Sequence, residues 1–307
     1  MAGLSGKRVL VTGASGLVAF PVATELAKAN EVHALARWSD PEQKRKMEAT
    51  GARAVTFDLA NPDLSSLPDV DVVINYAVLP QQYPQSYEVN TAATGRLARR
   101  YRDAQAFVHG GTGSAYEYQG ERALREDDPY GLHASIENYA ASKIASEFLL
   151  KHVSEDYGLP VTIVRIFSFY GPRGGAITQR IDQVAAGQPV SVYPGVRNVY
   201  TPLYEDDYVE KTIAAAGIAK VGAEVVNVGG TEPVTIQDYC RIAGEILGKE
   251  PIFVENSKAW PIWGDTTKMV SLLGPNKVSV GEGVRRVIES RRERLSGAHH
   301  VVGEPTE

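Results

Sequence analysis

The sequence predicts an α/β fold, in which a doubly wound parallel sheet carries helices on both faces and is followed by a smaller mixed C-terminal lobe. Short apolar runs alternate with amphipathic stretches over the first 170 residues, which is typical of strand–helix–strand units. A glycine-rich turn separates the first expected strand from the first expected helix. After residue 171 the alternation loosens and Gly and Pro recur, so this region is expected to form the smaller lobe.

Each expected element rests on its own apolar pattern. Before residue 170, short β-rich runs predict strands at 8–11, 31–35, 54–57, 70–75, 106–109 and 161–165. Longer stretches predict helices at 17–29, 41–49, 86–104 and 137–155. Further along, helices are expected at 177–186, 208–216 and 235–247, the last with Thr235 as its N-cap. A strand near 224–229 is expected to return to the sheet.

The composition is that of an ordinary globular protein and argues against several functional classes. The chain has 307 residues, of which 43% are hydrophobic and 22% are charged, enough for one sizeable core and a smaller lobe. A net charge of −5 predicts neither a nucleic-acid surface nor a polybasic membrane anchor. The single cysteine, Cys240, and the lack of an apolar leader favour a cytoplasmic location. The histidines show no metal-ligand spacing, so no metal site is expected.

The glycine-rich turn has the residues that a phosphate-binding loop needs. Gly13 permits a tight turn, Gly16 allows the backbone to approach a pyrophosphate, and Ala19 is small enough for the helix to pack on the strand. The following helix N-terminus offers free N–H groups and a partial positive charge. This predicts a Rossmann-type dinucleotide-binding domain at 1–170, a mainly substrate-binding lobe at 171–295 and a flexible tail at 296–307. The candidate cofactor-binding residues of this loop are Gly13, Ser15, Gly16, Leu17 and Val18.

A tyrosine and a lysine lie four residues apart in one expected helix, as Tyr139 and Lys143, and therefore share a face. A phenol with a pKa near ~10 is a poor base at neutral pH, and a nearby ammonium favours its ionised form. Tyr139 is therefore the candidate acid–base, which exchanges a proton with an alcohol or ketone while hydride moves to or from a nicotinamide. Lys143 is expected to hold the nicotinamide ribose hydroxyls.

A hydroxyl-bearing loop follows the fifth expected strand, where the carboxyl ends of parallel strands line the active crevice. Thr112 is the preferred candidate for the hydroxyl that orients the substrate oxygen, and Ser114 is the second. Both residues also fit a purely structural role as turn caps. Tyr116, in the same loop, is a candidate substrate contact.

These motifs together resemble the extended short-chain dehydrogenase/reductase family, in its NAD-dependent epimerase/dehydratase branch. The markers are 12–19, 58–59, 75–77, 89–90, 139–143 and 165–172, so the resemblance covers most of the chain. The family's loop hydroxyl, four residues before a tyrosine, corresponds to Thr112. The resemblance implies further contacts: Asp58 and Leu59 near the adenine, Ala77 and Asn90 near the cofactor, and Phe167 and Ser168 near the nicotinamide. Alternatively, Asn90 is a helix cap and Asp58 belongs to a strand-end turn.

The chain departs from the family pattern in three places. Gly113 and Ser114 stand where family dehydratases have an acidic pair, so dehydration is not expected. Ser168 replaces the usual asparagine. The segment that grips a nucleotide-sugar diphosphate is only loosely matched, with Arg173 and Arg197 as candidate substrate contacts and a surface arginine as an equal alternative for Arg197. The family also implies a homodimer through the helices expected at 86–104 and 137–155.

The end of the second expected strand favours NADP over NAD. No carboxylate occupies the position that would bind the adenosine ribose, and Arg37 and Ser39 are suited to a phosphate monoester. Asp40 lies close enough to keep NAD open. Arg37 as a plain surface residue is the alternative.

The sequence therefore predicts an NAD(P)-dependent oxidoreductase or epimerase acting on a secondary alcohol or ketone, with a sugar or nucleotide sugar as the expected substrate. An NADPH-dependent ketoreductase of a non-sugar carbonyl is a second hypothesis. A non-catalytic dinucleotide sensor is a third, and the intact Tyr139–Lys143 pair argues against it.

Overall fold

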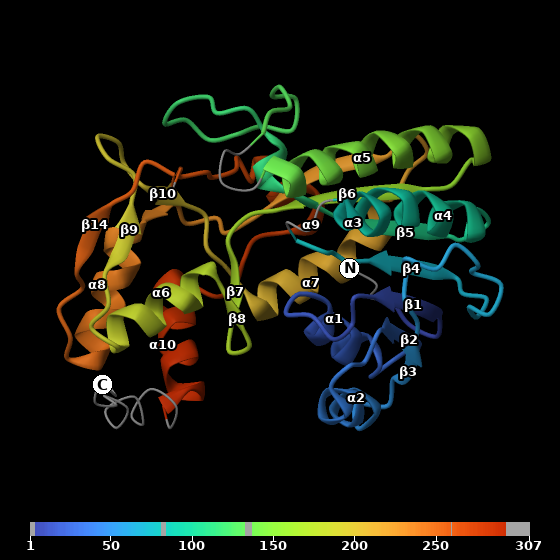
Figure 1. Cartoon of the computed structure of the whole chain (residues 1–307), viewed down its shortest axis with the longest axis horizontal. Coiled ribbons are helices and arrows are strands. Elements are labelled where there is room, and N and C mark those ends of the chain that lie inside the picture. Colours follow the sequence, from blue (N-terminus) through green and yellow to red (C-terminus); the bar gives the residue numbers. More distant parts are fainter. Residues whose placement is uncertain (1–3, 81–83, 133–136, 259, 293–307) are drawn as a thin grey trace, which may run out of the picture.

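A seven-stranded parallel sheet forms the centre of the computed structural model, which describes residues 4–80, 84–132, 137–258 and 260–292 (Figure 1). Its strand order is β12-β6-β5-β4-β1-β2-β3. The strands are β1 (Arg8–Thr12), β2 (Glu31–Ala36), β3 (Arg53–Thr56), β4 (Val72–Asn75), β5 (Ala106–Thr112), β6 (Val161–Ile166) and β12 (Glu224–Val228). The predicted doubly wound α/β fold is confirmed.

Helices cover both faces of this sheet, because its central strands are apolar on both sides. Val9, Leu10 and Val11 of β1 are all fully buried. In Figure 1, α4 and α5 lie over one face, and α1 and α7 lie over the other. The helices of this part are α1 (Ala19–Leu26), α2 (Pro41–Glu48), α3 (Gln85–Tyr87), α4 (Ala93–Arg100), α5 (Glu137–Tyr157), α7 (Glu205–Ala215) and α9 (Thr267–Leu273).

Several predicted bounds shift by a few residues, such as those of the helix expected at 17–29, which is α1. Two of the differences change the surroundings of the candidate site. The helix expected at 86–104 consists of α3, a π-helical turn η1 (Glu88–Ala92) and α4, and it ends at Arg100 because Tyr101 leaves the helical conformation. The strand expected at 106–109 continues to Thr112, because Gly110, Gly111 and Thr112 keep pairing with β6. Thr112 therefore ends a strand instead of lying in the following loop.

The remaining elements build the smaller lobe, on the left of Figure 1. Its core joins α6 (Ala176–Ala185), α8 (Ile236–Leu247) and α10 (Val280–Ser290). Thr235 caps α8, and its hydroxyl accepts a hydrogen bond from the backbone N–H of Asp238, as the sequence predicts. The short strands of this region are β7 (Phe169–Gly171), β8 (Gly174–Gly175), β9 (Val190–Val192), β10 (Val199–Tyr200), β11 (Leu203–Tyr204), β13 (Val234–Thr235) and β14 (Phe253–Glu255).

The strand order reverses between β1 and β4, which are neighbours in the sheet. In open parallel sheets, ligands bind at the carboxyl ends of the strands at such a reversal. The glycine turn after β1 and the loop after β4 therefore meet where a ligand site is expected. None of the helices within the described residues is long and apolar enough to cross a membrane.

Candidate active site

The glycine turn between β1 and α1 is closely packed against the end of β4. Gly13 has a φ of +69°, and a Cβ at this position would lie 2.8 Å from backbone atoms of Tyr76 and Ala77. No side chain caps the N-terminus of α1, so the partial positive charge of this helix end is open to an anion. Within the first turn the N–H of Phe20 donates to the carbonyl of Gly16. The residues present therefore fit the pyrophosphate of a dinucleotide.

Replacing Gly13 by valine is expected to weaken dinucleotide binding at least ~10-fold, because a β-branched residue combines a strained φ with a backbone clash. Isothermal titration with NAD(H) and NADP(H) measures the loss. Gly6→Val is the matched control, since Gly6 has a similar φ of +67° with nothing within 4 Å of its Cβ position. Equal affinity in the Gly13 variant and the wild type would contradict a phosphate-binding role for this turn.

Tyr139 and Thr112 come together at the carboxyl end of β5. Burial raises the pKa of Tyr139, and a hydrogen bond with the Thr112 side chain opposes that rise. The lowering of the Tyr139 pKa that the sequence predicts from Lys143 and the nicotinamide stays a prediction. The two hydroxyls nevertheless form the pair that the sequence proposes for handling a substrate oxygen.

Lys143 is buried, with 2% of its surface exposed, and its Nζ lies 3.1 Å from Nε2 of His109 on β5. Burial lowers the pKa of Lys143 to about 8, and the charge of Glu147 acts in the opposite direction. His109 was not among the residues predicted from the sequence. The available signal was a histidine inside a strand expected to be apolar on both faces.

A buried ion pair supports this part of α5. Glu147, one turn beyond Lys143, accepts hydrogen bonds from Arg165 of β6, and the Arg165 Nη2–Glu147 Oε2 distance is 2.8 Å. The two side chains are 2% and 0% exposed. Tyr130 also donates to Glu147. The pair therefore ties the helix that carries Tyr139 and Lys143 to the central sheet.

The loop after β5 is built on the capping interactions that the sequence left open. Thr112 Oγ1 accepts a hydrogen bond from the backbone N–H of Ser114 at 3.1 Å, so Thr112 is a turn cap in addition to its contact with Tyr139. Tyr116 is 4% exposed, and its hydroxyl donates to Asn227. The Tyr116 hydroxyl therefore serves an internal hydrogen bond.

The family-implied cofactor contacts fall into exposed and buried groups. Asp58 is exposed, and its carboxylate accepts a hydrogen bond from the backbone N–H of Ala60. This contact forms the strand-end turn that the sequence offers as the alternative role of Asp58. Leu59 is buried. Asn90 is fully buried and is not a helix cap: its amide binds the backbone of Leu79 and donates to Ser142 Oγ. It joins the loop after β4 to α5.

The two residues after β6 that were predicted near the nicotinamide differ in their burial. The ring of Phe167 is 1% exposed and lies where a Cβ on Gly113 or Gly264 would collide with it. Ser168 is half-buried, with a φ of +49°. The ring of Phe167 therefore packs closely against Gly113 in the loop after β5 and against Gly264.

The two arginines predicted as substrate contacts have different neighbours. The Arg173 guanidinium lies 3.9 Å from the ring centroid of Phe20 on α1. Arg197 is exposed, and its backbone N–H donates to Glu121. Arg173 packs on α1 and the backbone of Arg197 binds Glu121, so the substrate role of both arginines stays a prediction.

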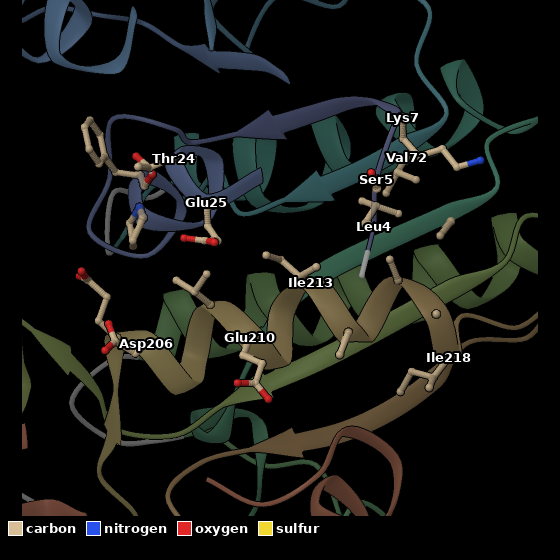
Figure 2. A pocket seen from close by; sticks show the side chains of 18 of the residues that line it. Leu4, Ser5, Lys7, Thr24, Glu25, Val72, Asp206, Glu210, Ile213 and Ile218 are labelled. Atoms are coloured by element: carbon tan, nitrogen blue, oxygen red, sulfur yellow. The ribbon is translucent and has the colours of Figure 1, made fainter. Parts of the chain in front are cut away.

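A cavity of about 1240 Å³ runs along the groove between α1 and α7 (Figure 2). Figure 2 shows Ile213 and Glu210 of α7 on one side and Glu25 of α1 on the other. Of the predicted site residues, Arg173 is the one that lines this cavity. The cavity is therefore separate from the Tyr139–Thr112 pair.

A buried tryptophan shapes the turn after β2. Trp38 has a φ of +48°, and its indole N–H donates to the carbonyls of Ala34 and Val55. Arg37 and Ser39, on either side of it, are exposed. The Asp40 carboxylate accepts from the backbone N–H of Glu42 and caps α2. The turn therefore presents a guanidinium and a hydroxyl, while Asp40 is engaged within the protein.

Comparison with known proteins defines the class. The model of the NAD dependent epimerase/dehydratase family matches residues 9–229. The chain belongs to this family, which confirms the resemblance found in the motifs.

Individual relatives include both epimerases and a dehydratase. The chain is 26% identical to YtcB, an uncharacterized UDP-glucose epimerase of Bacillus subtilis, over 87% of this chain and 92% of that protein. It is 32% identical to dTDP-glucose 4,6-dehydratase of Xanthomonas campestris over 52% of this chain and 50% of that protein. The structure of UDP-glucuronic acid 4-epimerase from Bacillus cereus, in complex with UDP-glucuronic acid and NAD, matches with a TM-score of 0.82 and 25% identity over 94% of this chain and 99% of that one.

Proposed function

We propose that this protein is an NAD(P)-dependent epimerase that oxidises and re-reduces a secondary alcohol of a nucleotide sugar. The observation that carries the proposal is the pairing of Tyr139 with Thr112 at the carboxyl end of β5, in a chain of the epimerase/dehydratase family. The similarity to epimerases of UDP-sugars over nearly the whole chain supports the substrate class.

The chemistry divides between the cofactor and the side chains. The nicotinamide supplies the acceptor and donor of hydride when it is bound. Tyr139 takes the hydroxyl proton as the carbon–hydrogen bond of the alcohol gives up hydride, and it returns a proton when the ketone is reduced. Thr112 donates a hydrogen bond to the substrate oxygen and keeps it beside Tyr139. Reduction of the ketone on its opposite face would invert the carbon, with Tyr139 supplying the proton to the oxygen.

The loop after Thr112 favours epimerisation over dehydration. Expulsion of a hydroxyl requires a general acid, and Gly113 and Ser114 provide no carboxylate there. The relatives include dehydratases. The proposal of an epimerase and not a dehydratase therefore depends on the lack of a carboxylate at Gly113 and Ser114.

We further propose NADP as the preferred cofactor. The exposed Arg37 and Ser39 beside β2, and the use of Asp40 as the cap of α2, support a site for a 2′-phosphate. The Bacillus cereus epimerase was solved with NAD, which favours NAD instead. Arg37→Glu is expected to weaken NADP(H) binding ~10-fold or more with little loss of NAD(H) binding, because the carboxylate repels the phosphate. Titration of both cofactors measures this, and an unchanged NADP(H)/NAD(H) ratio would contradict it.

Native mass spectrometry of the purified protein tests the proposed function together with a turnover assay. We expect the added mass of a bound dinucleotide. We also expect the protein to convert UDP-glucuronic acid or UDP-glucose to its epimer. Net consumption of NADPH with a non-sugar ketone would replace the epimerase by a ketoreductase. Dinucleotide binding without turnover of any alcohol or ketone would favour a sensor.

A further inference from the structure

A chain of buried hydrogen bonds runs from the first strand to Lys143, and its proton positions follow from one fixed end. Thr12 Oγ1 accepts the backbone N–H groups of Tyr76 at 3.1 Å and Ala77 at 3.0 Å. A hydroxyl has one proton to donate. The Thr12 proton therefore goes to Oδ1 of Asn75, at 2.7 Å.

This contact determines the orientation of the Asn75 amide. Its Nδ2 faces Thr94 Oγ1 at 3.0 Å and His109 Nδ1 at 3.1 Å. Thr94 donates its own proton to the carbonyl of Asn90, so it accepts one amide hydrogen. The other amide hydrogen points at Nδ1 of His109, which must accept it.

A neutral imidazole whose Nδ1 accepts carries its proton on Nε2. His109 Nε2 lies 3.0 Å from Ser146 Oγ and 3.1 Å from Lys143 Nζ. Ser146 donates to the carbonyl of Lys143, so its oxygen accepts from His109. An ammonium has three donors and no acceptor. If Lys143 were charged, an ammonium N–H would face the Nε2–H of His109, and neither group could accept a hydrogen bond. The neutral amine has a lone pair that can accept a hydrogen bond from Nε2–H.

We propose that His109 is a positioning residue that opposes the charged form of Lys143 and so makes Lys143 the pH-sensitive group of the site. The protonation of Lys143 is a property of the protein alone. Its effect on turnover rests on the proposed function, because the ammonium is the form that favours a Tyr139 phenolate.

The surroundings of both groups are consistent with this assignment. Burial holds the pKa of His109 well below its usual value, and the charge of Lys143 adds to that effect. Lys143 is faced by Glu147 on its own helix and by His109 on β5, and Glu147 is paired with Arg165 on β6. Asn90, from the π-helical turn, contributes a neutral amide to α5 through Ser142.

Two variants are expected to move the Lys143 titration in opposite directions. His109→Phe removes the opposing N–H and raises the titration midpoint of the Lys143 amine by about one pH unit, a factor of ~10 in proton affinity. Ser146→Ala removes the competing acceptor, directs the Nε2 proton to Lys143 and lowers the midpoint. The midpoint is followed by NMR of protein labelled at the lysine ε-carbon, with Lys143→Met to assign the signal. His33→Phe, on β2, is the control for loss of a largely buried imidazole and leaves the midpoint unchanged.

The wild-type protein provides a test that needs no variant. In long-range proton–nitrogen spectra of ring-labelled histidine, His109 is expected to stay neutral with Nε2 protonated between about pH 6 and 9. A proton on Nδ1, or shifts of the Lys143 midpoint in the same direction in both variants, would overturn the proposal.

The activity measurement separates this proposal from the proposed function. With UDP-glucuronic acid as the substrate, the alkaline loss of turnover is expected to follow the Lys143 midpoint upward in His109→Phe. If turnover occurs but its pH profile ignores both variants, the coupling to catalysis is wrong. If the NMR result holds and no nucleotide sugar is turned over, the protonation assignment stands and the proposed function fails.

Discussion

Tyr139→Phe is expected to lower the turnover number for a nucleotide sugar by about 10²–10⁴-fold, the usual contribution of a positioned general acid–base. The variant keeps the partly buried ring and loses the hydroxyl that meets Thr112. Cofactor affinity should change little, because Gly13 and the N-terminus of α1 are untouched. Steady-state turnover of UDP-glucuronic acid and dinucleotide titration separate the two effects.

Tyr157→Phe is the matched control for this substitution. Tyr157 ends the same helix, with 43% of its surface exposed, and takes no part in the proposed site. Its variant should retain wild-type turnover. A Tyr139→Phe enzyme within about threefold of the wild type would remove Tyr139 from the chemistry, since loss of a general acid–base costs far more.

Arg165→Met is expected to lower the free energy of unfolding by about 3–5 kcal/mol, because it leaves Glu147 as a buried carboxylate without its cation. Glu147 is 0% exposed, and its principal partner is Arg165. Urea unfolding followed by circular dichroism measures the loss. The effect should reach catalysis as well, since this pair holds the helix of Tyr139 and Lys143 against β6.

Two further variants test whether the unpaired charge is the cause. The double variant Arg165→Met/Glu147→Leu removes both charges and should recover much of the lost stability. Arg8→Met breaks a pair with Asp71 whose side chains are 49% and 23% exposed, and it should lower the stability much less than Arg165→Met, because solvent screens an exposed ion pair. If the double variant were no more stable than Arg165→Met, packing and not charge would explain the loss.

The spacing of residues along the chain was enough to predict much of the fold and part of the candidate site. The position of Gly13 predicted the tight turn between a strand and a helix, and the capping pattern at Thr235 predicted the start of α8. The interval between Tyr139 and Lys143 placed both on one helix. These predictions depend on residues that are neighbours along a single turn, helix or strand, and their geometry follows from backbone periodicity.

The contacts across elements could not be predicted in this way. Asn90 was expected beside the cofactor, and only the structure shows that its amide also binds Leu79 and Ser142. Tyr116 was expected to contact substrate, and its hydroxyl binds Asn227, which is distant in sequence. In each case the partner lies on another element.

The sequence by itself therefore determined the class of fold, the glycine turn between β1 and α1, and the shared helix of the candidate tyrosine and lysine. Only the tertiary structure decided that Lys143 lies against His109, and that Thr112 meets Tyr139 while capping its own turn. The reason is physical. Periodicity determines which side chains share a face of one element, whereas strand order and register determine which faces meet, and those depend on packing of the whole chain.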